Sequence, residues 1–303
     1  MKSIYILLIL LAAVSCKNRN SDADSDGAEA VSNISESAIS GAGQQATSSE
    51  GATSPFVAME AMTVHDLGLL DPQDVNISSP CAFSSARTTC SSNVSTIDWA
   101  GCTVHSATLT GGWAETWSPG FCSNGALPGA LTNGTSVTRT STGQVLTLPS
   151  GATLTENTTA HSTYNSTSIP GTGIDVSMAG GTRTVVIHGL RRILKGPFGR
   201  SWFDHSITST GITITGTRAA GTRTVSGTST MYHNFAQYTA AHTFNTVTWG
   251  TPSCCYPTSG SVSSVLTGTR AGSVSLAFTS TCGQATFTDT DSSVSTVTLS
   301  QCN

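Results

Sequence analysis

The chain has 303 residues, of which 10% are charged, and its formal net charge is −4. This acidic balance gives little support to nucleic-acid binding, which requires clustered positive charge. Ser and Thr together make up about 30% of the residues, and Thr is β-branched and favours strands. The composition therefore predicts a Thr-rich β protein.

The first 15 residues are predicted to be a lipoprotein signal peptide. Lys2 supplies a positive charge, Ile4–Leu11 is an apolar run, and small residues precede Cys16. The apolar run is too short to remain as a membrane-spanning helix. Small residues followed by Cys resemble the lipobox of bacterial lipoproteins, which implies that Cys16 carries a diacylglycerol and a further acyl chain such as palmitate. Because Lys17 rather than Asp follows, we expect the outer membrane; the periplasmic face and the cell surface both stay open.

Residues 16–55 are predicted to be the lipidated Cys16 and a flexible polar linker. The stretch from residue 17 contains mainly Ser, Ala, Gly, Asp and Glu, with no aromatic residue. Such a segment cannot bury enough apolar surface to offset its chain entropy. It would hold the folded body clear of the membrane.

Residues 56–303 are predicted to form a Ser/Thr-rich antiparallel β domain, preceded by a short helix from Ser54 through Met62. Large apolar residues alternate with small ones, as in Val274–Thr279, which is typical of half-buried strands. Connections as short as Pro149–Gly151 join antiparallel neighbours. We therefore expect an all-β meander, either a curved sheet, a sandwich or a partly closed barrel. Two subdomains, about 56–165 and 166–303, stay open.

The tripeptide Gly-Thr-Arg recurs four times in this domain without a constant spacing. We interpret it as a recurring hairpin device that places Arg at the rim of a sheet. The copies are Gly181–Arg183, Gly216–Arg218, Gly221–Arg223 and Gly268–Arg270.

Eight further cysteines indicate disulfide bonds, because an even number in an exported protein is typical of oxidised pairs. The eight cysteines fall into two groups of four, one between residues 81 and 122 and the other between residues 254 and 302. Two disulfide bonds are expected within each group. Adjacent Cys254 and Cys255 point to opposite faces of an extended strand, so Cys282 and Cys302 are predicted as their two partners. No Cys–His spacing typical of zinc is present, and no metal or cofactor is expected. The candidates are Cys81, Cys90, Cys102, Cys122, Cys254, Cys255, Cys282 and Cys302.

One basic stretch interrupts the Thr-rich pattern and is a candidate binding loop. Its Gly196-Pro-Phe-Gly199 sequence is typical of a loop, and it carries four of the thirteen Lys and Arg residues. Such a loop could bind an anionic glycan or an envelope protein. The candidate residues are Arg191, Arg192, Lys195, Phe198 and Arg200.

Catalytic signatures are weak. Ser201–His205 contains a Ser, an Asp and a His, but local adjacency does not make a triad and no GxSxG motif is present. No catalytic residue is assigned.

The C-terminal region resembles Thr-rich, antiparallel-β lipoproteins of the Gram-negative cell envelope, which are largely uncharacterised. The resemblance rests on Cys255–Val262, Gly268–Arg270, Phe278–Thr286 and the approach to Cys302. It implies an envelope location and a β body, and it brings no catalytic residues. We expect a non-enzymatic outer-membrane lipoprotein that serves as a structural, adhesive or partner-binding module. A lipocalin-like carrier of an apolar ligand is the alternative, and a secreted hydrolase using His205 is a third.

Overall fold

The computed structural model describes residues 88–99, 102–104, 107–119, 133–147, 149–216, 220–251, 253–254 and 256–298. Over these residues the chain is all-β, and no helix occurs among them. The predicted all-β antiparallel meander is confirmed. The signal peptide, Cys16, the linker and the short helix expected near Ser54 lie outside the described residues. Within the described part, no helix is long and apolar enough to cross a membrane.

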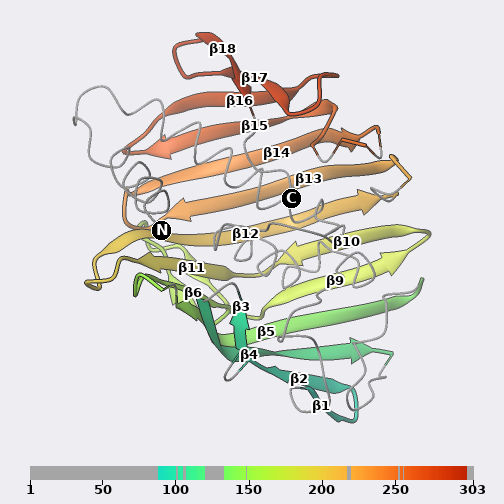
Figure 1. Cartoon of the computed structure of the whole chain (residues 1–303), viewed down its shortest axis with the longest axis vertical. Coiled ribbons are helices and arrows are strands. Elements are labelled where there is room, and N and C mark those ends of the chain that lie inside the picture. Colours follow the sequence, from blue (N-terminus) through green and yellow to red (C-terminus); the bar gives the residue numbers. More distant parts are fainter. Residues whose placement is uncertain are drawn as a thin grey trace, which may run out of the picture.

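Eighteen strands are described, and Figure 1 labels most of them. Their bounds are β1 Thr88–Ser91, β2 Val94–Asp98, β3 Cys102–Val104, β4 Ala107–Ser118, β5 Thr135–Thr147, β6 Thr153–Asn157, β7 His161–Ser162, β8 Ser168–Ile169, β9 Ile174–Ala179, β10 Thr182–Ile187, β11 Leu190–Lys195, β12 Ser201–Thr215, β13 Arg223–His233, β14 Tyr238–Trp249, β15 Ser259–Gly268, β16 Gly272–Phe278, β17 Gln284–Thr288 and β18 Val294–Thr298.

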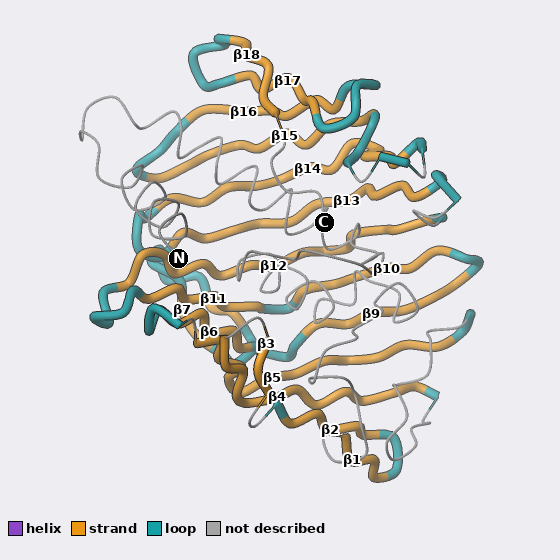
Figure 2. The backbone as a smooth tube through the Cα atoms, in the orientation of Figure 1, coloured by secondary structure: helices purple, strands orange, loops and turns teal. Residues whose placement is uncertain are grey.

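Sixteen of these strands form one antiparallel sheet, which is partly ring-like and does not close into a barrel. From β12 to β18 every strand pairs with the next one in the chain (Figure 2). Among the described strands, β1 and β18 are the two ends of the sheet. Two predicted turns lie where expected, because β5 ends and β6 begins on either side of Pro149–Gly151, and Asp291–Ser293 separates β17 from β18.

The middle of the sheet divides into two branches. The second half of β5 pairs with β6, which pairs with β11 and then with the first half of β12. The first half of β5 pairs instead with β9, which pairs with β10 and then with the second half of β12. Residues 158–173, called the strap below, connect the two branches and contain the small hairpin of β7 and β8.

The two faces of the sheet differ in composition. The face that carries the hydrophobic cluster, called the core face, includes Trp113, Val176, Met231 and Phe244, each at most 2% exposed. The opposite face, called the open face, carries mainly Ser and Thr. In β16 the alternation places Val274 and the apolar residues that follow on the core face. Alternating apolar and hydroxyl residues therefore fix which side of each strand is buried.

One β-bulge brings two backbones unusually close. The register between β13 and β14 shifts between Val225 and Gly227, and Gly227 has a φ of 135°. A Cβ atom at Gly227 would lie 2.3 Å from the carbonyl oxygen of Gly211. Only glycine fits this position without displacing β12.

Candidate functional site

A row of polar and aromatic side chains crosses the core face at one end of the sheet. Each residue lies directly opposite the next on a neighbouring strand, from β5 through β6, β11, β12 and β13 to β14. The row, called the polar row below, consists of Gln144, Glu156, Arg192, His205, His233 and Tyr238.

The polar row begins with two strong contacts. The indole Nε1 of Trp113 donates a hydrogen bond of 2.6 Å to Oε1 of Gln144. Oε1 of Glu156 lies 2.7 Å from Nε of Arg192, and both side chains are buried. Burial raises the pKa of Glu156, although the adjacent Arg192 guanidinium acts in the opposite direction. The ion pair is therefore held in surroundings that disfavour an isolated carboxylate.

Aromatic rings continue the polar row. The ring centroids of His205 and His233 are 4.4 Å apart, and those of His233 and Tyr238 are 4.9 Å apart. The guanidinium carbon of Arg270 lies 5.1 Å from the centre of the Tyr238 ring, which is a cation–π contact. Burial, together with the nearby His233 and Arg192, lowers the pKa of His205 well below its ordinary value. The charged form of His205 is therefore disfavoured in this position.

The core face buries further charged groups outside this row. Nε of Arg139 lies 2.6 Å from Oε1 of Glu115, and both side chains are almost fully buried. Arg183 and Arg223, from two Gly-Thr-Arg copies, are 6% and 3% exposed. The Gly-Thr-Arg pattern predicts these arginines at the rim of the sheet. They sit at the starts of β10 and β13, but strand alternation turns them to the core face.

His242 forms a second buried polar pair on the core face. Its Nδ1 lies 2.7 Å from Oγ of Ser264 on β15. Burial lowers the pKa of His242 to about 4. A ring with so low a pKa is a weak base at neutral pH.

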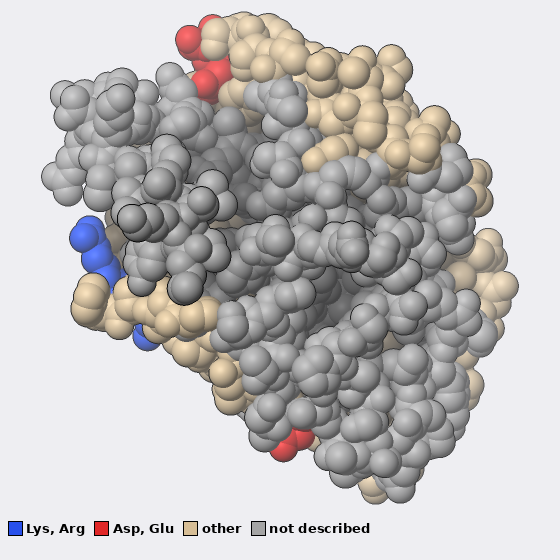
Figure 3. Space-filling model, viewed as in Figure 1, with Lys and Arg blue, Asp and Glu red and all other residues tan. Residues whose placement is uncertain are grey.

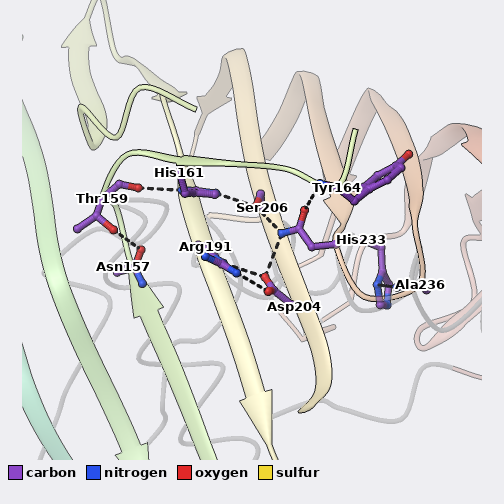
Figure 4. A network of polar contacts seen from close by, with 10 residues as sticks. Asn157, Thr159, His161, Tyr164, Arg191, Asp204, Ser206, His233 and Ala236 are labelled. Carbon is purple, nitrogen blue, oxygen red and sulfur yellow. Dashed lines mark hydrogen bonds and ion pairs between the residues drawn. The ribbon is translucent and has the colours of Figure 1, made fainter. Parts of the chain in front are cut away.

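On the open face, a network of hydrogen bonds fastens the strap to β12 (Figure 4). Nε2 of His161 lies 2.8 Å from Oγ of Ser206. The amide nitrogen of Asn234 donates to the same Ser206 oxygen at 2.8 Å and to a carboxylate oxygen of Asp204 at 3.0 Å. Arg191 donates to Asp204 through Nε at 2.9 Å. The backbone N–H of Tyr164 donates to Asn234 Oδ1 at 3.2 Å.

The Ser206–His161 contact has the reach of a nucleophile and a base. Nδ1 of His161 lies 2.8 Å from the carbonyl oxygen of Thr159, which orients the ring. Ser206, however, is 0% exposed, so a substrate cannot approach its hydroxyl. The arrangement is a structural clamp that holds the strap.

Asp204 and His205, from the segment Ser201–His205, do not lie together as members of a triad. Asp204 and His205 are consecutive on β12 and therefore point to opposite faces. Asp204 binds Arg191 and Asn234, and the ring of His205 lies against His233. Burial acts to raise the pKa of Asp204, but the hydrogen bonds from Arg191 and Asn234 outweigh it, so the pKa lies below its ordinary value.

The basic stretch expected to form one loop is mostly strand, so that expectation is corrected. Arg191 and Arg192 belong to β11 and point to opposite faces, toward Asp204 and Glu156 respectively. Leu190, Arg192 and Leu194 occupy every second position, and this spacing would have indicated a strand with Arg192 on the buried face. The exposed part is the hairpin turn that follows, where Phe198 is 98% exposed and is flanked by exposed Lys195 and Arg200.

Cys254 and Cys282 form a disulfide with an S–S distance of 2.11 Å. This is one of the two pairings expected for Cys254. Cys90 and Cys102 belong to β1 and β3, and their side chains are outside the described atoms. Cys16, Cys81, Cys122, Cys255 and Cys302 lie outside the described residues. Among the residues whose placement is described, no group of three metal-binding side chains occurs.

Rows of hydroxyl side chains cover the open face between β13 and β17. One row runs across five adjacent strands through Thr228, Thr243, Ser263, Ser275 and Thr288. Thr228 and Thr243 are exposed, and the other three are half-buried. No Asp, Glu, Lys, Arg or His lies on the open face of these five described strands. Comparison with protein-family models and with curated proteins finds no match for this sequence.

Proposed function

We propose that this chain is a non-enzymatic, lipid-anchored module of the bacterial outer membrane that binds an envelope partner through the open face of β13–β17. The observation that carries the proposal is the uncharged Ser/Thr row from Thr228 to Thr288. Protein surfaces that are designed to meet only water are given about 25–35% charged residues. A wide sheet face without charge is therefore better suited to a polar, uncharged partner surface than to solvent alone.

The chemistry of this face defines what it would bind. Thr and Ser hydroxyls both donate and accept hydrogen bonds, and Thr adds a methyl group beside each hydroxyl. Neutral hydroxyl or amide groups of an envelope glycan or protein match this pattern. The absence of cations on the face of these described strands argues that an anionic glycan would not be held here. The buried Ser206 and the oppositely directed Asp204 and His205 support a non-enzymatic role.

A site-specific photo-crosslinker tests the binding face in the intact cell envelope. Placed at exposed Thr243, it is expected to form a defined adduct with an envelope protein or glycan. The matched control is exposed Ser280, in the turn between β16 and β17 at an end of the strands. Equal adduct yields at Thr243 and Ser280, or none at Thr243, would contradict the proposal.

The anchor is tested separately. Cys16→Ala is expected to abolish incorporation of a radiolabelled fatty acid into the protein. Unchanged labelling would overturn the lipid anchor without bearing on the open face.

A further inference from the structure

The turns at one end of the sheet carry two exposed aromatic rings. Phe198 is 98% exposed in the turn between β11 and β12, and Phe235 is 60% exposed in the turn between β13 and β14. Because β12 and β13 run antiparallel, these two turns lie at the same end, at the left in Figure 1. The two turns are about two strand spacings, roughly 10 Å, apart across the sheet. Because β12 continues four residues beyond the pair His205–His233, the Phe198 turn projects further from the sheet than the Phe235 turn.

Positive charge gathers at the same place. Among the described side chains, Lys195 and Arg200 are the only exposed lysine and arginine residues. They flank Phe198 on the two arms of one hairpin, where Gly196 N–H donates to the carbonyl oxygen of Arg200 at 2.8 Å. In Figure 3 the Lys and Arg atoms are visible only at the left margin. Asp204, four residues after Arg200 in the chain, is already bound to Arg191.

The turn that carries Phe198 has a defined backbone conformation. Gly199 N–H donates to the carbonyl oxygen of Gly196 at 2.9 Å, which closes a four-residue turn with Pro197 at its second position. Gly199 has a φ of +77°, which glycine adopts without strain. The backbone at Phe198 is therefore held in a defined turn, so ordering the turn on binding costs little conformational entropy.

We infer that this end of the sheet, comprising Lys195, Phe198, Arg200 and Phe235, docks on an anionic phospholipid surface. A protruding ring of this kind is buried when the surrounding medium closes around it, as the headgroup–acyl boundary of a bilayer does. Lys195 and Arg200 would then lie level with the lipid phosphates. The acidic turn with Asp289 and Asp291 lies about six strand spacings away, roughly 29 Å, so it need not touch the same patch.

The inference goes beyond the proposed function and does not depend on the lipid anchor. Its test therefore uses the full chain with Cys16→Ala and vesicles of phosphatidylcholine with or without phosphatidylglycerol. Every variant carries the same first 87 residues, so the ratio of the vesicle partition coefficients of two variants reports the effect of the substitution in the hairpin. Phe198→Ser is expected to lower the partition coefficient about tenfold or more. Lys195→Gln with Arg200→Gln should lower it about fivefold per charge, and only on anionic vesicles.

Two matched controls accompany these variants. Val265→Ser removes an exposed apolar side chain from the open face, away from the turns. Ser280→Asp with Thr281→Asp changes the net charge by the same two units at the opposite end of the sheet. Both are expected to bind vesicles like the parent chain. Equal losses in the controls, or no loss in Phe198→Ser, would overturn the inference. A third result would also overturn it. If the Lys195 and Arg200 substitutions weaken binding, Phe198→Ser does not, and a soluble anionic oligosaccharide abolishes the binding, the hairpin is a glycan site.

Insertion of the ring can be observed directly. Phe198→Trp adds a fluorophore to a chain with five tryptophans, of which Trp99, Trp113, Trp117 and Trp249 are at most 3% exposed. The emission of the parent chain, which includes that of Trp202, is subtracted. Lipids brominated near the headgroup are expected to quench the added emission of Phe198→Trp and to leave that of Val265→Trp unchanged. Equal quenching in the two variants would exclude the proposed orientation.

Discussion

Glu156 and Arg192 face one another across β6 and β11, with Glu156 Oε1 2.7 Å from Arg192 Nε. Both are buried in the polar row. Removing one partner of a buried ion pair leaves an uncompensated charge, whereas removing both can be nearly neutral. We expect Arg192→Met to lower the free energy of unfolding by about 3 kcal/mol at pH 7. Glu156→Leu combined with Arg192→Met should recover most of it. Urea unfolding checks this, and equal losses in both variants would contradict it.

His242 gives the protein a pH-dependent stability. Its folded pKa is about 4, whereas its ordinary value is 6.5. Between these values the unfolded chain binds a proton that the folded chain does not, so the free energy of unfolding falls as the pH is lowered from 6.5 toward 4. The loss from this group approaches about 3 kcal/mol at roughly 1.4 kcal/mol per pH unit.

The variant that isolates this effect is His242→Gln. Its urea midpoint should change less between pH 7 and pH 5 than that of the parent chain. Some dependence remains, because the pKa of His205 is lowered in the same direction. Thr243→Ala, at the exposed neighbouring position, should keep the parent pH dependence. If the urea midpoint of His242→Gln changes with pH as much as that of the parent chain, the ring of His242 is not buried as described.

The strap should loosen when its clamp is removed. His161→Ala and Ser206→Ala each delete one side of the 2.8 Å contact, and Ser206→Ala also leaves Asn234 with one acceptor fewer. We expect a coupling energy of about 1 kcal/mol in a double-mutant cycle. Hydrogen exchange should accelerate at the Tyr164 amide, which donates to Asn234. Additive single effects would show that His161 does not hold Ser206.

The Cys254–Cys282 bond closes a loop with a sequence separation of 28. A loop of this length is expected to stabilise the folded chain by about 3–4 kcal/mol. Cys254→Ser with Cys282→Ser should therefore lower the free energy of unfolding by that amount. A reductant should then change the stability of the double variant less than that of the parent. Equal responses would indicate that other disulfides carry the effect.

The sequence predicts the strands of this sheet better than their partners. The alternation in Val274–Thr279 and the turns at Pro149–Gly151 and Asp291–Ser293 are local signals, and the structure places strands and turns there. The pairing of β5 with both β6 and β9 is decided by contacts between distant residues. No local pattern in Thr135–Thr147 indicates that its two halves have different neighbours.

The polar row was missed because buried charge contradicts the simple rule that charged residues face water. Glu156 and Arg192 each share strand parity with apolar neighbours, Leu154 and Leu194. That parity places them on the core face as surely as it places the leucines. Pairing Glu156 with Arg192 required the register between β6 and β11, which sequence periodicity does not contain. The hairpin with Phe198 was located correctly, but Arg191 and Arg192 were assigned to a loop because of their charge.

The divided middle of the sheet also determines the order in which the chain can assemble. From β12 onward each strand can pair as soon as it becomes available, because its neighbour in the sheet is the preceding strand of the chain. β5 instead exposes one edge that must wait for two different partners. The seam closes only when β12, which ends at Thr215, bridges β11 and β10. Until then one edge of β11 and one edge of β10 lack a partner and can pair with foreign strands, so the intermediate that precedes β12 is prone to aggregation.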